Sequence, residues 1–120
     1  MKKCTAKIMP LSVAGMFAGI GGFELGLARS GHKPRLFCEL DSAARAVLDS
    51  RFPGVEKVGD IRSLDHLPPD VSLLTAGFPC QDLSSSGLKQ GLEGERSSLV
   101  SEVFRLLQFS RVQWVLIENV

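Results

Sequence analysis

The sequence predicts an alternating α/β fold, with a mostly parallel sheet that carries helices on both faces. Short apolar runs, typical of buried strands, alternate with stretches in which apolar residues recur at helical spacing. Strands that alternate with helices favour parallel pairing through crossover connections. A chain of 120 residues is long enough for one domain with a modest core.

Each element follows from a local pattern. Apolar runs predict strands at 11–17, 35–39, 55–58, 71–76 and 114–117. Helical spacing predicts helices at 22–30, 41–51 and 98–109. In the first helix Phe23, Leu27 and Ala28 share one helical face, and in the third Val100, Val103, Phe104 and Leu107 recur at helical spacing. Gly31 is expected to stop the first helix, and Asp41 to cap the second.

Composition excludes several classes of protein. With 44% hydrophobic and 22% charged residues the chain is globular, and its net charge of +1 lacks the basic excess of an autonomous nucleic-acid binder. The three cysteines form no C-x-x-C pair, so we expect neither a disulfide framework nor a metal site. No apolar run has the length of a membrane span, and no signal-peptide core follows Met1. These features predict a cytoplasmic protein without membrane contact.

A glycine-rich turn joins the first strand to the first helix. Its adjacent Gly21 and Gly22 do not match the dinucleotide pattern G-x-G-x-x-G, so by itself it fits a structural turn as well as a ligand cradle. Glu39 follows 20 positions after Gly19, at the end of the second strand, where an acid can face ribose hydroxyls. Together they indicate a nucleoside-type cofactor without specifying which one.

Cys80 leaves the fourth strand for a polar loop, at the sheet edge where open α/β sheets bind ligands. Most cysteines are small core residues, but this one stands between Pro79 and Gln81 in a polar setting. No histidine lies near it in sequence, which gives no support to a cysteine–histidine pair. A thiolate without such a base suits attack on an electron-poor ring that is activated by protonation.

Three segments carry a family resemblance. Phe-Ala-Gly-Ile-Gly-Gly at 17–22, Gly-Phe-Pro-Cys-Gln at 77–81 and Glu-Asn-Val at 118–120 resemble, in order and separation, signature motifs of the DNA (cytosine-5) methyltransferase family. The resemblance implies a Rossmann-like, S-adenosylmethionine-dependent methyltransferase fold, truncated after about the fifth strand. It further implies methyl transfer from S-adenosylmethionine to carbon 5 of cytosine in DNA, with S-adenosylhomocysteine as product.

The resemblance also implies a donor pocket. Phe17 would lie beside the donor, Glu39 would bind its ribose, Leu40 would pack on the adenine, and Asp60 would accept the adenine amino group. The full set of implied cofactor-binding residues is Phe17, Ala18, Gly19, Ile20, Gly21, Gly22, Glu39, Leu40, Asp60, Ile61 and Phe78.

The catalytic residues implied by the resemblance begin with Cys80, which would attack carbon 6 of a cytosine flipped out of the duplex. Glu118 would protonate ring nitrogen 3, and Asn119 would fix the local backbone. The implied catalytic set is Cys80, Glu118, Gln81, Pro79 and Asn119. The loop from Gln81 to about Ser98 would close over DNA, using Ser84, Ser86, Lys89 and Arg96.

The resemblance spans 11–120 but only the first part of the family's length. We therefore expect 1–120 to be the N-terminal part of a catalytic domain, without the target-recognition domain and later motifs. The chain is expected to be a fragment or a split subunit whose second polypeptide supplies target recognition on double-stranded DNA, as in a restriction-modification system. Two alternatives stay open: a tRNA cytosine-5 methyltransferase, and an inactive remnant or regulatory module.

Overall fold

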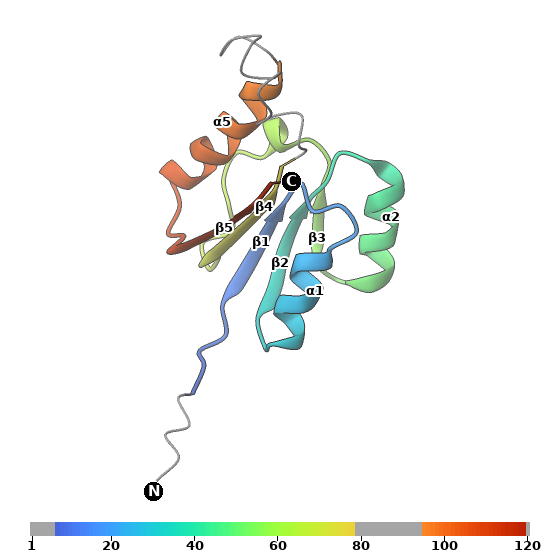
Figure 1. Cartoon of the computed structure of the whole chain (residues 1–120), viewed down its shortest axis with the longest axis vertical. Coiled ribbons are helices and arrows are strands. Elements are labelled where there is room, and N and C mark those ends of the chain that lie inside the picture. The colour runs from blue at the N-terminus through green and yellow to red at the C-terminus, as the bar shows by residue number, and fades with distance from the viewer. Residues whose placement is uncertain (1–6, 79–94, 120) are drawn as a thin grey trace, which may run out of the picture.

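The computed structural model describes residues 7–78 and 95–119, with the backbone alone at 95–98. Its centre is a five-stranded sheet in the order β3-β2-β1-β4-β5, in which every neighbouring pair is parallel (Figure 1). The strands are β1 (Ser12–Met16), β2 (Lys33–Cys38), β3 (Glu56–Val58), β4 (Leu73–Gly77) and β5 (Trp114–Glu118). All five predicted strands are confirmed, with ends that differ by at most two residues.

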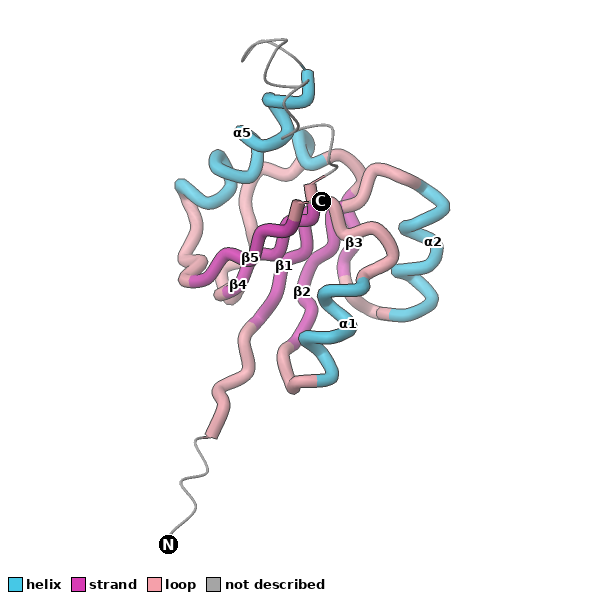
Figure 2. Tube along the Cα trace, viewed as in Figure 1, coloured by secondary structure: helices cyan, strands magenta, loops and turns pink. Residues whose placement is uncertain are grey.

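Helices cover both faces of this sheet, as predicted. The helices are α1 (Gly22–Arg29), α2 (Ser42–Arg51) and α5 (Glu95–Gln108), and a short 3-10 helix, η1, spans Ile61–Ser63. Helices α1 and α2 lie on one face and α5 lies on the other (Figure 2). Because side chains alternate along a strand, Phe37 of β2 belongs to the core cluster of Leu48 in α2, whereas its neighbours Leu36 and Cys38 belong to the cluster that includes Leu106 of α5.

The helix ends follow from the residues that cap them. Gly31 has a φ of 95°, and two bonds close the end of α1: Gly31 N–H to Ala28 O (3.0 Å) and His32 N–H to Leu27 O (3.0 Å). At the start of α2 the Asp41 carboxylate accepts a bond from Ala43 N–H at 3.1 Å. Both predicted caps are therefore confirmed.

The apolar faces of α1 and α5 that the sequence indicates are only partly the buried ones. Phe23 is 38% exposed and Glu24 only 2%, so an acid occupies the position expected for an aromatic ring. Gly15 of β1 makes the room, because a Cβ placed on it would overlap Glu24 Oε1. In α5, Phe104 is 60% exposed and Leu106 is buried instead. Successive helical residues differ by about 100° in direction, so Glu24 points about 100° away from Phe23, and Leu106 about 200° away from Phe104.

Strand β5 forms one edge of the sheet among the described strands. Trp114, Val115, Leu116 and Ile117 are all between 41% and 62% exposed, although each is apolar. None of the described helices is long and apolar enough to cross a membrane.

Candidate functional site

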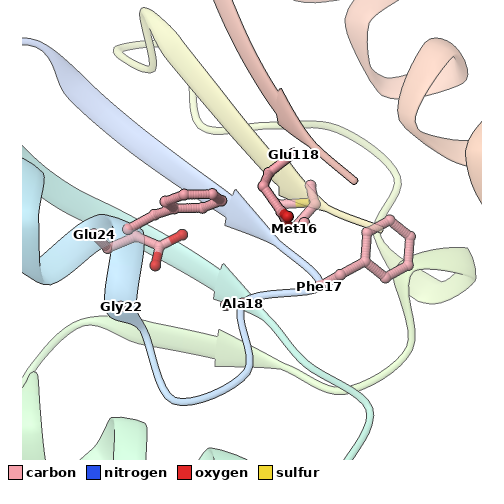
Figure 3. A pocket seen from close by; sticks show the side chains of 8 residues that line it. Met16, Phe17, Ala18, Gly22, Glu24 and Glu118 are labelled. Atoms are coloured by element: carbon pink, nitrogen blue, oxygen red, sulfur yellow. The ribbon is translucent and has the colours of Figure 1, made fainter. Parts of the chain in front are cut away.

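The carboxyl ends of the strands meet around the glycine turn, and two adjoining cavities lie there. The first cavity, about 460 Å³, is lined by Phe17, Cys38, Glu39, Leu40, Gly59, Asp60, Ile61, Arg62, Gly77 and Leu99. The second cavity, about 520 Å³ and shown in Figure 3, is lined by Met16, Phe17, Ala18, Gly22, Phe23, Glu24, Gly77 and Glu118. Phe17 and Gly77 belong to both walls, so the two cavities meet at these residues.

Phe17 holds the turn in an uncommon conformation. Its φ is 52°, in the left-handed region that residues other than glycine rarely adopt. Ala18 N–H donates to Cys38 O at 3.1 Å and Gly21 N–H donates to Ala18 O at 2.9 Å, which fixes the turn on both sides. The Phe17 ring lies 5.2 Å from the ring of Phe78. The surrounding structure thus holds a strained residue where the two cavities meet. Backbone strain of this kind is often found at functional sites.

Glu39 ties the turn to the beginning of α2. Its Oε1 accepts Gly19 N–H at 2.7 Å, and its Oε2 accepts Asp41 N–H at 2.9 Å. Arg45 Nη1 donates to the carbonyls of Glu39 and Leu40, both at 2.7 Å, and so fixes the backbone beside the carboxylate. Each carboxylate oxygen has a second lone pair, which leaves Glu39 able to accept further bonds from hydroxyl groups in the first cavity.

Asp60 and Ile61 also line the first cavity. The Asp60 carboxylate accepts bonds from the backbone and guanidinium of Arg62, with Nη2 at 2.8 Å, and the side-chain hydrogen bond lowers the pKa of Asp60. Ile61 is 3% exposed. Arg105 of α5 donates to the carbonyls of Ile61 (3.2 Å) and Leu64 (2.8 Å), which fastens η1 to the helix.

Some predicted cofactor residues lie elsewhere. Gly19, Ile20, Gly21 and Phe78 line neither cavity, and the Ile20 side chain is 50% exposed. Phe78 is buried in the core behind Phe17. Gly21 has a φ of 83° and lies close to the C-terminal part of α2, since a Cβ at this position would be 2.8 Å from atoms of Leu48 and Phe52. The structure therefore brings together Phe17, Ala18, Gly22, Glu39, Leu40, Asp60 and Ile61 around the cavities.

Glu118 ends β5 and lines the second cavity. Its carbonyl accepts Phe78 N–H at 3.1 Å, which joins β5 to the segment leaving β4. Asn119 follows in an exposed position. The other predicted catalytic and DNA-contacting residues lie outside the described residues, or, for Arg96, have no described side chain: Pro79, Cys80, Gln81, Ser84, Ser86, Lys89 and Arg96. Within the described ranges, no cluster of side chains could hold a metal ion.

Sequence reasoning missed the pair of Glu24 and Thr75, which are 2% and 0% exposed. Thr75 Oγ1 donates to Glu24 Oε1 at 2.7 Å. Burial raises the pKa of the Glu24 carboxyl, and the bonds from Thr75 and from its own backbone only partly oppose this. A signal was present, because Glu24 shares a helical face with Leu27 and Ala28, and an acid on an apolar face is unusual.

Comparison with known proteins identifies relatives of this chain. The family model for C-5 cytosine-specific DNA methylase matches residues 11–120. The type II methyltransferase M2.BsuMI of Bacillus subtilis is 49% identical over 114 residues, covering 92% of this chain and 29% of its own length. The type II methyltransferase M.HhaI of Haemophilus parahaemolyticus is 37% identical, with 88% of this chain and 32% of its own length covered.

Solved structures share the fold. A prophage-encoded Escherichia coli protein assigned as a DNA modification methyltransferase superposes with a TM-score of 0.73 and 27% identity, covering 92% of this chain and 32% of its own. The Dnmt2 methyltransferase of S. pombe superposes with a TM-score of 0.62 and 19% identity, covering 92% of this chain and 34% of its own. The fold is thus the Rossmann-like fold of S-adenosylmethionine-dependent methyltransferases, and the chain spans about a third of the length of these relatives. With its family model matched from 11 to 120, the chain belongs to the C-5 cytosine-specific DNA methylase family.

Proposed function

We propose that this chain supplies the methyl-donor pocket and the cysteine nucleophile of a DNA (cytosine-5) methyltransferase of a restriction-modification system. The observation that carries the proposal is the pair of adjoining cavities, with Glu39 in the wall of one and Glu118 in the wall of the other. A nucleoside-bearing donor in the first cavity can extend past Phe17 toward the residue assigned to base chemistry. Family membership supports the same reaction.

The residues of the first cavity suit S-adenosylmethionine, which supplies an electrophilic methyl group on a sulfonium. Glu39 would accept bonds from the ribose hydroxyls, and the exposed Leu40 would cover one face of the adenine. Buried Ile61 would contact the ring from η1, and Phe17 would border the sulfonium end. Asp60 would accept the adenine amino group while it keeps its bond to Arg62, since a carboxylate has lone pairs for both.

The chemistry assigned to the chain's own residues is a covalent addition and elimination. The Cys80 thiolate forms a bond to carbon 6 of a cytosine flipped out of double-stranded DNA, while Glu118 delivers a proton to ring nitrogen 3. Carbon 5 thereby gains electron density and takes the methyl group, leaving S-adenosylhomocysteine. The ring nitrogen 3 proton then returns to Glu118, and the carbon 5 proton passes to a water molecule acting as base, which restores the double bond as the Cys80 sulfur departs as thiolate. Asn119 would hold the backbone after Glu118, and Pro79 and Gln81 would orient the cysteine.

Sequence-specific methylation requires more than these 120 residues in our proposal, because the relatives are about three times as long as the matched region. We assign target recognition to further polypeptide, in the same chain or in a second subunit. The loop carrying Ser84, Ser86, Lys89 and Arg96 would close on the phosphates of the DNA.

A covalent trap tests this function. The chain, combined with the polypeptide that completes it, would be incubated with S-adenosylmethionine and duplex DNA containing 5-fluorocytosine, which blocks the final elimination. We expect an adduct that mass spectrometry maps to Cys80, that is lost in Cys80→Ala and that persists in the matched control Cys4→Ala. An adduct on a tRNA probe and none on DNA would redirect the substrate to RNA. Donor binding without any adduct would refute the nucleophile.

A further inference from the structure

A buried carboxyl group lies beneath the glycine turn. Glu24, in the first turn of α1, reaches over β1 at Gly15 and accepts a 2.7 Å bond from Thr75 Oγ1 of β4. The side chain is 2% exposed. Acidic side chains are seldom buried to this degree unless a partner compensates them, and here Oε1 has one.

The second oxygen of this carboxyl has no such partner. Glu24 Oε2 is buried, and no hydrogen-bond donor reaches it from the part of the chain that the structure describes. An unsatisfied buried polar atom destabilises the fold, so a native protein that keeps one usually has a further use for it. An apolar or amide side chain at position 24 would remove the charge from the interior.

Glu24 also forms part of the wall of the second cavity. Figure 3 shows its carboxyl group and that of Glu118 facing the same space from opposite sides. Among the described residues that line this cavity, none is a lysine, arginine or histidine. The part of the wall that the structure describes therefore offers two carboxyl groups and no cationic partner for them, which favours a positively charged occupant.

We propose that Glu24 binds the α-ammonium group of the amino-acid portion of S-adenosylmethionine, a role that rests on the donor pocket proposed above. The first cavity takes the nucleoside, and the shared residues Phe17 and Gly77 mark the passage to the second cavity. A donor that crosses this passage brings its amino-acid portion to the cavity that Glu24 lines. Charge-assisted hydrogen bonds in such a desolvated place are strong.

Three ligands separate the groups of the donor that Glu24 could contact. S-adenosylmethionine has an α-ammonium, an α-carboxylate and a sulfonium. S-adenosylhomocysteine lacks only the sulfonium, and 5′-methylthioadenosine lacks all three groups. Affinities would be measured by calorimetry for the full chain, for Glu24→Gln, which removes the charge at constant shape, and for Glu56→Gln. Glu56 is an exposed acid at the start of β3 and lines neither cavity, so it is the matched control.

We expect Glu24→Gln to weaken S-adenosylmethionine and S-adenosylhomocysteine by about tenfold or more, as for loss of a charged hydrogen bond, and to leave 5′-methylthioadenosine unchanged. A second variant, Glu24→Leu, should give the same selective loss. Thermal unfolding of each variant would confirm that it is folded.

Other results would overturn the assignment in distinguishable ways. If Glu24→Gln matched the wild type for all three ligands while Glu39→Ala lost affinity, the donor pocket would stand and the role of Glu24 would be refuted. Equal weakening of all three ligands would make Glu24 a structural residue. Loss confined to S-adenosylmethionine would move the contact to the sulfonium. A wild-type chain that bound none of the three would refute the donor pocket itself.

Discussion

Three glycines of one turn should respond differently to the same substitution. Gly19 and Gly21 both have positive φ, at 58° and 83°, whereas Gly22 does not. A Cβ on Gly19 or Gly22 would meet nothing within 4 Å, but one on Gly21 would lie 2.8 Å from Leu48 Cδ2 and from Phe52 Cε2. An alanine series therefore separates backbone strain from steric overlap at adjacent positions.

The magnitudes follow from these two terms. A left-handed alanine costs about 1–2 kcal/mol, which is the whole effect expected for Gly19→Ala. Gly21→Ala adds overpacking of about 1–3 kcal/mol, because the Leu48 and Phe52 side chains are buried and cannot move aside freely. Gly22→Ala, in the first turn of α1, should be neutral or stabilising by up to about 1 kcal/mol.

Urea unfolding followed by far-UV circular dichroism would give the three free-energy differences, with unchanged slopes as the check that the denatured state is the same. The expected order of stability is Gly22→Ala, then Gly19→Ala, then Gly21→Ala. Equal losses for Gly19→Ala and Gly21→Ala would show that the turn does not press on α2. A large loss for Gly22→Ala would contradict the open space beside that residue.

Three further predictions concern charged or reactive side chains. Burial raises the pKa of Glu24 above its unfolded value of 4.5, so the unfavourable effect of its charge on folding is absent below pH 4.5 and grows as the pH rises toward the folded pKa. The stability of Glu24→Gln relative to wild type should therefore increase across that pH window. A difference in stability that stayed constant from pH 4 to 8 would contradict this. Arg105→Leu should destabilise the fold by about 1–3 kcal/mol in the same urea assay, and it should weaken donor binding because η1 loses its bonds to α5. Arg29 is exposed, so the control Arg29→Leu should change stability by less than about 0.5 kcal/mol. Burial first, and then the charges of Glu39 and Asp60, raise the pKa of Cys38 to about 11. At pH 8 iodoacetamide should therefore label the Cys38 peptide only after unfolding, and rapid labelling of that peptide in the native chain would refute the burial.

The sheet could be predicted because its signals are local. Apolar runs locate the strands, Gly31 and Asp41 mark two helix ends, and parallel strands bring their carboxyl ends to one edge. This is why the proximity of Glu39 to the glycine turn was predictable from sequence. The structure adds that Glu39 binds Gly19 N–H, so its carboxylate also stabilises the turn it was expected to serve.

The rest depended on contacts between distant segments. The burial of Glu24 needs the empty space over Gly15 and the hydroxyl of Thr75, which lie on two strands that are 60 residues apart in sequence. A hydrophobicity pattern within α1 favours burial of Phe23, because it contains no information about the missing side chain at Gly15 on β1. The η1 turn was likewise missed, since its carbonyls are held by Arg105, 44 positions beyond Ile61.

Stability and binding should respond to Glu24→Gln with opposite signs, which distinguishes a ligand contact from a packing role. If the carboxyl served only the packing of α1 on the sheet, an isosteric amide would keep the Thr75 bond, relieve the desolvated charge and leave ligand affinity unchanged. If the carboxyl serves a cationic ligand, the same change stabilises the free protein but weakens the complex. Such opposition is expected where a site retains a destabilising group for function. The unpaired, buried Oε2 of a residue in the cavity wall, together with the lack of cationic side chains among the described lining residues, favours the second case.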